Sequence, residues 1–131
     1  MPYLIDSDWV IDHLDGIPSA VALLAQLAAD GNAISIVTYM EVYQGIIRSP
    51  DPIDAELRLN RFVAGAMVLP FSMPVAQRCA RLRESLRRQG KRVNPRSLDL
   101  IIAAAALEHD LTLVTRNTDD YRDIPGLTLY R

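Results

Sequence analysis

Acidic and amide side chains stand near the ends of several short apolar segments of this chain, far apart in the sequence. They are Asp6, Glu41, Asp99 and the group Asn117, Asp119 and Asp120. In an open α/β sheet the binding crevice lies beyond the carboxyl ends of the strands. We therefore expect these oxygens to meet at one end of one sheet.

Converging carboxylates repel one another and need a compensating positive charge. Oxygen-only ligands select a hard cation such as Mg²⁺ or Mn²⁺ over zinc. Such a cation lowers the pKa of a bound water and neutralises charge on a phosphoryl oxygen. Together with the arginine-rich segment between Arg78 and Arg96, the acids therefore predict metal-assisted hydrolysis of nucleic acid.

Most of these acids also have an ordinary structural role open to them. Asp6 can end a strand and cap the helix that follows. Glu41 and Thr38 match the capping box Thr-x-x-Glu, which satisfies backbone N–H groups at a helix start. Asp119 and Asp120 can be turn residues.

Asp99 lies near the start of an apolar segment, Leu98–Leu107. The positive end of a helix dipole favours an acid in the first turn. However, a helix that is apolar nearly all round is buried, and an unpaired carboxylate there is costly. A cation or a proton is therefore the expected partner of Asp99.

Basic residues are concentrated in one part of the chain. The formal net charge is −2, from 14 Lys plus Arg against 16 Asp plus Glu, but eight of the cations lie between Arg78 and Arg96. Local charge decides what approaches a surface, so this segment can bind phosphates, or it can be the solvated face of a helix. The candidate RNA-binding residues are Arg81, Arg87, Arg88, Lys91, Arg92 and Arg96.

Short β-branched segments alternate with helical patterns along the chain, which predicts an α/β sandwich with a parallel sheet. Helices are expected over 8–14 with Ser7 as cap, from Pro18, from Thr38, from Asp51-Pro52, from Ser72 or Met73 to Gly90, and from Asn94-Pro95 to Glu108. The expected strands are Tyr3–Ile5, Ala33–Val37, Met67–Leu69, Leu111–Val114 and Leu127–Tyr130.

Composition bounds the class of protein. With 131 residues, 50% of them hydrophobic and 23% charged, we expect a single folded domain over residues 1–131 rather than a disordered chain. No apolar run reaches the ~18 residues that span a bilayer. The N-terminus lacks the pattern of a signal peptide, and a single cysteine, Cys79, permits no internal disulfide. We expect a cytoplasmic protein with no membrane span.

Four segments, in order, resemble the motifs of PIN-domain ribonucleases, and the length is similar to that of the VapC toxins of bacterial toxin–antitoxin pairs. The resemblance covers nearly the whole chain. Ser7 and Asp8 depart from the Thr and Asn that are common after the first acid. The segments are Leu4–Ile11, Ser35–Val42 with Gly45, Asp99–Ala106, and Leu113–Tyr121 followed by Ile124–Leu127.

The resemblance implies a role for each matching position. Asp6, Glu41 and Asp99 take the three acidic positions of the family, with Asp6 and Asp99 as direct Mg²⁺ ligands. Asp120 is our choice for the fourth acid, although Asp119 and Asn117 remain alternatives. The resemblance places further polar residues around the metal or the substrate, and these are Ser7, Asp8, Thr38, Thr115, Arg116 and Asn117.

The resemblance also implies a fold, an activity and partners. The fold is a three-layer sandwich with a central parallel sheet of four to five strands flanked by helices. The activity is endoribonuclease cleavage of RNA with Mg²⁺ or Mn²⁺, in a toxin that forms a homodimer and is held inactive by a cognate antitoxin. Tyr3, Trp9, Tyr39 and Tyr43 are candidates to stack a base or to line the antitoxin groove, or they are core residues.

Two other classes of function remain open from the sequence. Asp6-Ser7-Asp8 after a strand resembles the Asp-x-Asp of haloacid-dehalogenase phosphatases, which form an aspartyl phosphate. These enzymes, like receiver domains, need a lysine against the phosphate, and the only lysine here is Lys91. The second alternative is a non-catalytic RNA- or protein-binding module in which the acids are purely structural.

Overall fold

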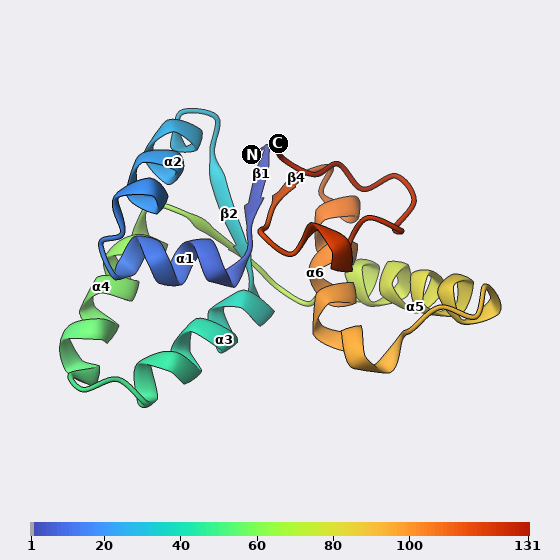
Figure 1. The fold of residues 1–131 in the computed structure, drawn as a ribbon, viewed down its shortest axis with the longest axis horizontal. Coiled ribbons are helices and arrows are strands. Elements are labelled where there is room, and N and C mark those ends of the chain that lie inside the picture. Colours follow the sequence, from blue (N-terminus) through green and yellow to red (C-terminus); the bar gives the residue numbers. More distant parts are fainter. Residues whose placement is uncertain (1) are drawn as a thin grey trace.

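The computed structural model describes residues 2–131, which form a parallel four-stranded sheet with helices on both faces (Figure 1). The strand order is β3-β2-β1-β4. The second and third strands therefore lie on one side of β1, and β4 lies on its other side. This reversal makes the carboxyl ends of β1 and β4 the switch point where α/β sheets bind ligands. The strands are Tyr3–Ile5 (β1), Asn32–Ser35 (β2), Met67–Leu69 (β3) and Thr112–Val114 (β4).

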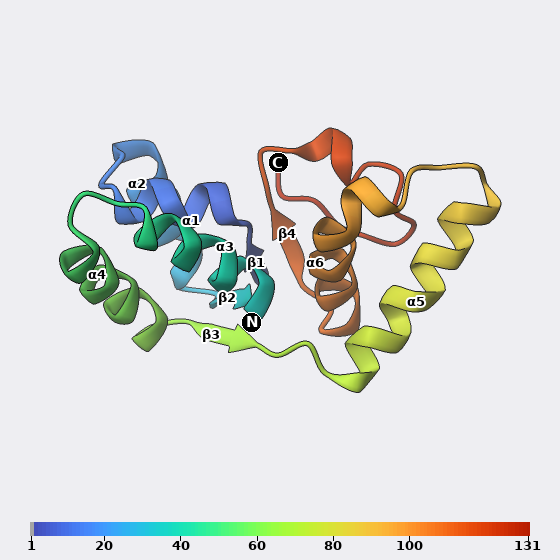
Figure 2. The ribbon, with the colours of Figure 1, turned by 90° about the horizontal axis from the view of Figure 1, so that it is seen from below.

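Alternate residues of each strand feed two separate hydrophobic clusters, as the pleat requires. Leu4, Ala33 and Leu113 pack on one side, with α5 and α6. Ile5 and Val114 pack on the other, with α1 to α4. Figure 2 shows these two groups of helices on either side of the sheet. The helices are Ser7–Leu14 (α1), Pro18–Ala28 (α2), Ile36–Ile47 (α3), Pro52–Ala64 (α4), Met73–Arg88 (α5) and Ser97–Glu108 (α6). The expected three-layer α/β fold is confirmed.

The expected fifth strand, Leu127–Tyr130, is wrong. Within the described part of the chain this segment forms a single bridge, in which Leu113 N–H donates to the Thr128 carbonyl at 2.9 Å and Tyr130 N–H donates to the Leu113 carbonyl at 2.9 Å. The segment therefore covers the edge of β4 without forming a further strand.

Two helix starts also differ from expectation. Helix α1 begins at Ser7 rather than Asp8, because Asp6, the other candidate cap, is the one that the structure uses. Helix α3 begins at Ile36, because the Ser35 hydroxyl accepts hydrogen bonds from the backbone N–H groups of Val37 and Thr38 at 3.0 and 3.2 Å. Thr38 is thus inside the helix, and Glu41 is not part of a capping box. This removes the structural role that competed with a chemical one for Glu41.

The remaining expected caps are confirmed at Asp51 for α4 and Ser72 for α5. The Asn94-Pro95 start takes the form of a 3-10 turn that leads into α6. No helix in residues 2–131 is long and apolar enough to cross a membrane.

Candidate active site

Asp6 is held rigidly at the carboxyl end of β1. The register that pairs Ile5 with Val114 brings the residues after β1 and β4 side by side. Asp6 Oδ1 accepts the Ser7 backbone N–H at 2.8 Å, and Oδ2 accepts the Thr115 hydroxyl at 2.7 Å. The residue is 4% exposed. Burial raises the pKa of Asp6 above its usual value, while these two hydrogen bonds oppose the rise.

Asp99 extends from the first turn of α6 and is half-buried. Its Oδ1 accepts the Tyr121 hydroxyl at 3.1 Å. Burial raises the pKa of Asp99, and the negative charges of Asp6 and Asp120 raise it further. Asp99 and Asp6 are therefore close enough to interact electrostatically.

Glu41 brings a third carboxylate to the same site from α3, where it is half-buried. Burial raises the pKa of Glu41, and so do the charges of Asp6 and Asp99, while a hydrogen bond with Ser7 lowers it. Asp8, which is exposed, adds repulsion to both Asp6 and Glu41. We define the acidic cluster as Asp6, Glu41, Asp99 and Asp120.

The donor chemistry of the acidic cluster fits a hard divalent cation. Asp6 is buried, Glu41 and Asp99 are half-buried, and Asp120 is exposed. The cation that lowers the pKa of Asp99, Arg96, is itself paired with Asp123. Within residues 2–131 no three His, Cys, Asp or Glu side chains are placed to hold an ion together. Mg²⁺ characteristically keeps several waters and binds through one or two carboxylates, so it does not require three side chains from the acidic cluster.

Neutralising Glu41 should stabilise the metal-free protein at neutral pH. A carboxyl whose folded-state pKa is raised destabilises the fold above that pKa, and this penalty disappears as the pH falls through it. We expect Glu41→Gln to raise the Tm by a few degrees in a chelating buffer at neutral pH, and the advantage to shrink in acid. Thermal unfolding against pH measures this.

The matched control is Asp30→Asn, which removes one negative charge at an exposed position outside the acidic cluster. An equal rise in Tm for both variants, or a fall for Glu41→Gln, would show that Glu41 does not experience the repulsion described above.

Other predicted site residues lie close to the acidic cluster or on its elements. Thr115 bonds Asp6 and also accepts the backbone N–H of Asn117 at 3.1 Å. Thr38 is fully buried on α3, one turn before Glu41, and its hydroxyl has no hydrogen-bond partner among residues 2–131. A buried unpaired hydroxyl is a typical location for an ordered water.

Arg116 lies against α1. Its guanidinium pairs with Asp12 at 2.6 Å and lies 3.9 Å from the centroid of the Trp9 ring. These contacts explain the position of the Arg116 side chain, which needs no bond to the acidic cluster. Arg116 would have to leave Asp12 to reach a phosphate.

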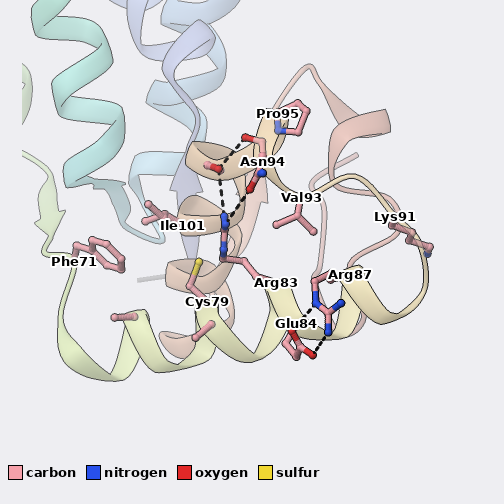
Figure 3. Close-up of a pocket in the computed structure, with 13 residues that line it drawn as sticks. Phe71, Cys79, Arg83, Glu84, Arg87, Lys91, Val93, Asn94, Pro95 and Ile101 are labelled. Carbon is pink, nitrogen blue, oxygen red and sulfur yellow. Dashed lines mark hydrogen bonds and ion pairs between the residues drawn. The ribbon is translucent and has the colours of Figure 1, made fainter.

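We define the basic segment as residues 78–96. Three of its cations, Arg83, Arg87 and Lys91, line a groove of about 760 Å³ between α5 and the loop that precedes α6 (Figure 3). Arg83 donates to the Ser97 hydroxyl and the Asn94 side chain at 3.2 and 3.3 Å. Glu84 pairs with two of the predicted RNA-binding residues, Arg87 at 2.7 Å and Arg88 at 3.0 Å. The positive charge of this surface is therefore partly neutralised.

Arg96 requires a correction, because it is not an exposed phosphate contact. It is 9% exposed, its guanidinium binds both oxygens of Asp123 at 2.7 and 3.0 Å, and it donates to the Asp120 carbonyl at 2.6 Å. Lys91 lies 3.9 Å from the same Asp123 carboxylate. The predicted RNA-binding residues Arg81 and Arg92 are exposed.

Tyr121 is a site residue that the sequence analysis did not identify. It is 1% exposed, and burial, followed by the charges of Asp6 and Asp99, strongly raises the pKa of its phenol. The hydroxyl is thus a permanent hydrogen-bond donor at physiological pH. Its position directly after Asp120 indicates that it lies near the acidic cluster. Nothing local in the sequence indicates that its hydroxyl binds Asp99.

Known proteins are similar to this chain over nearly its whole length. The family model of the PIN domain matches residues 3–127. The tRNA(fMet)-specific endonuclease VapC of Shigella flexneri is 29% identical over 127 residues, covering 97% of this chain and 95% of that protein. Ribonuclease VapC19 of Mycobacterium tuberculosis is 30% identical, covering 95% of each.

Solved structures are similar over the same length. VapBC2 from Rickettsia felis, bound to a promoter DNA fragment, superimposes with a TM-score of 0.87 at 26% identity, over 99% of this chain and 98% of that one. DNA-bound VapBC from Salmonella typhimurium also gives a TM-score of 0.87, at 25% identity, over 99% and 97% of the two chains.

Proposed function

The chain belongs to the PIN-domain family, and we propose that it is the endoribonuclease toxin of a toxin–antitoxin pair, dependent on Mg²⁺ or Mn²⁺. The observation that carries the proposal is that Asp6, Glu41 and Asp99, from three separate elements, lie near enough to interact: in addition to burial, the charges of Asp6 and Asp99 raise the pKa of Glu41, and the charge of Asp6 raises the pKa of Asp99. Full-length similarity to proteins named as VapC ribonucleases supports the same activity.

Asp6 and Asp99 are the proposed metal ligands. With a divalent cation held there, the site would have positive charge to place against a phosphoryl oxygen and a means of lowering the pKa of a water. Thr115 and the Ser7 backbone keep the Asp6 carboxylate in one orientation, because each binds one of its oxygens. Glu41, with its raised pKa, is suited to accept a proton from the attacking water.

RNA binding is proposed for the exposed cations of the basic segment. Arg81 and Arg92 are the most available, and Arg87 and Arg88 can exchange Glu84 for a phosphate because these pairs are exposed. Contacts of this kind position RNA without reading its sequence. The identity of the RNA would then depend on the loops around the acidic cluster.

A cognate antitoxin and a homodimer are proposed as partners. The similar solved structures are VapBC complexes, according to their descriptions. Large apolar side chains are also exposed on this chain, including Met40 at 49%, Ile47 at 65% and Ile53 at 79%. Exposed apolar surface is typical of protein interfaces.

The aspartyl-phosphate alternative has no support from the position of the lysine. Lys91 lies in the loop after α5, and its ammonium is beside Asp123 rather than beside Asp6. A phosphatase of that type needs its lysine against the phosphate.

Expression of the chain in bacterial cells, with and without the product of the neighbouring gene, tests the proposed function. We expect growth arrest and discrete RNA fragments when the chain is expressed alone, and relief of both when the two proteins are expressed together. Growth curves and the 5′ ends of cellular RNA are the measurements. Normal growth with intact RNA at high levels of the folded chain would refute the proposal.

A further inference from the structure

Tyr121 connects the segment after β4 with the first turn of α6. Its hydroxyl donates to Asp99 Oδ1 at 3.1 Å, and its ring packs in the core cluster with Leu100 and Ala103 of the same helix. A buried tyrosine usually finds a partner for its hydroxyl. Here that partner is a member of the acidic cluster.

The segment that carries Tyr121 is itself fixed to the start of α6. Arg96 binds the carbonyl of Asp120, directly before the tyrosine, and both carboxylate oxygens of Asp123, two residues after it. The Tyr121 backbone N–H also donates to the Thr118 carbonyl at 3.1 Å. These contacts, with the packing of the ring, leave the phenol hydroxyl little freedom to move.

Within the described residues, the Asp99 carboxylate accepts a hydrogen bond from Tyr121 alone, whereas the Asp6 carboxylate accepts hydrogen bonds from two donors. The backbone N–H of Ser7 and the hydroxyl of Thr115 bind the two oxygens of Asp6. The Tyr121 hydroxyl binds one oxygen of Asp99, which leaves Oδ2 available. Groups that orient a metal ligand in this way contribute substantially to metal affinity.

We propose that Tyr121 is a positioning residue that holds the Asp99 carboxylate by Oδ1 and presents Oδ2 to a divalent cation. The proposal rests on the proposed function in one respect, the role of Asp99 as a metal ligand. It assigns the tyrosine a role beyond packing, because the ring alone would fill the core equally well without the hydroxyl.

Tyr121→Phe tests the proposal because it removes the hydroxyl and keeps the ring. We expect the affinity for Mn²⁺, measured by calorimetry and by the metal-induced rise in Tm, to fall about tenfold, the lower end of the range for such partners. RNA cleavage should fall at limiting Mn²⁺ and recover towards the wild-type rate at saturating Mn²⁺. The Tm in a chelating buffer should change little.

The matched control is Tyr130→Phe, which removes a tyrosine hydroxyl from a ring that packs edge-on against Tyr3. This variant should keep wild-type Mn²⁺ affinity. Equal Mn²⁺ affinities for Tyr121→Phe and wild type would overturn the positioning role, and so would equal losses in the two variants. An unfolded Tyr121→Phe would also overturn it, because the hydroxyl would then be needed for folding.

The outcomes separate this proposal from the proposed function. A wild-type protein that binds Mn²⁺ but cleaves no RNA would refute the ribonuclease, while the comparison of Mn²⁺ affinities would still decide the role of Tyr121. A wild-type protein that binds no Mn²⁺ would overturn the positioning role.

Discussion

Asp6→Asn is expected to lower RNA cleavage at least about 1,000-fold while leaving the fold intact. Asn keeps the shape of Asp6 and can still accept the Ser7 backbone N–H, and the Thr115 hydroxyl can reverse to accept from the new amide. What the variant loses is one negative charge that holds the cation. A metal ion contributes several kcal/mol of transition-state stabilisation, and about 4 kcal/mol corresponds to a factor of 10³.

Purified wild type and Asp6→Asn would be stripped of metal with a chelator and compared on a labelled RNA as Mg²⁺ or Mn²⁺ is restored. Asp30→Asn, with the same change of charge at an exposed position, should cleave like wild type. On expression, wild type and Asp30→Asn should arrest growth, and Asp6→Asn should not. If Asp6→Asn cleaves RNA at the wild-type rate, Asp6 has no part in the reaction.

Arg96→Ala is expected to be the most destabilising of the substitutions in the basic segment, lowering the free energy of unfolding by about 3 kcal/mol. Removing one member of a largely buried ion pair costs about 3–5 kcal/mol, and the lower end applies because the Asp123 side chain is 27% exposed. For a chain of this size, that corresponds to a fall in Tm of about 10 °C.

Acid should reduce the difference in Tm between wild type and Arg96→Ala. Arg96 holds the pKa of Asp123 below its usual value. A lowered folded-state pKa contributes stability above the usual pKa of the carboxyl, and that stability is lost as the pH falls through the folded-state value. The gap in Tm should therefore be full at neutral pH and should narrow in strong acid.

Arg92→Ala is the matched control, because Arg92 is exposed and its side chain has no ion pair within residues 2–131. We expect it to leave the Tm unchanged and to weaken RNA binding if the basic segment contacts phosphates. If Arg96→Ala and Arg92→Ala have equal Tm values, and Arg96→Ala loses more RNA binding than Arg92→Ala, the structural role of Arg96 is refuted.

Much of the fold follows from local patterns in the sequence. Apolar β-branched segments predict β1, β3 and β4 within one residue, and Asp51-Pro52 and Ser72 predict the starts of α4 and α5. The acids after the strands could also be identified, since parallel strands end at one edge of a sheet. These features depend on near neighbours in the chain.

Other features depended on contacts that no local pattern contains. The start of α3 was misplaced because two residues three positions apart, Ser35 and Thr38, both have a hydroxyl that can cap a helix, and the structure uses the first. The last segment was assigned as a strand from its composition, although it meets β4 at one residue pair.

The sequence by itself determined which residues can carry the chemistry, because carboxylates at strand ends and an acid in an apolar helix are properties of residue type and spacing. Tertiary structure decided which neighbours those residues have. The Thr115–Asp6 bond joins residues 109 positions apart, and the Tyr121–Asp99 and Arg96–Asp123 bonds join residues 22 and 27 apart. Such bonds depend on how the layers pack, so the sequence could not distinguish buried Arg96 from exposed Arg92.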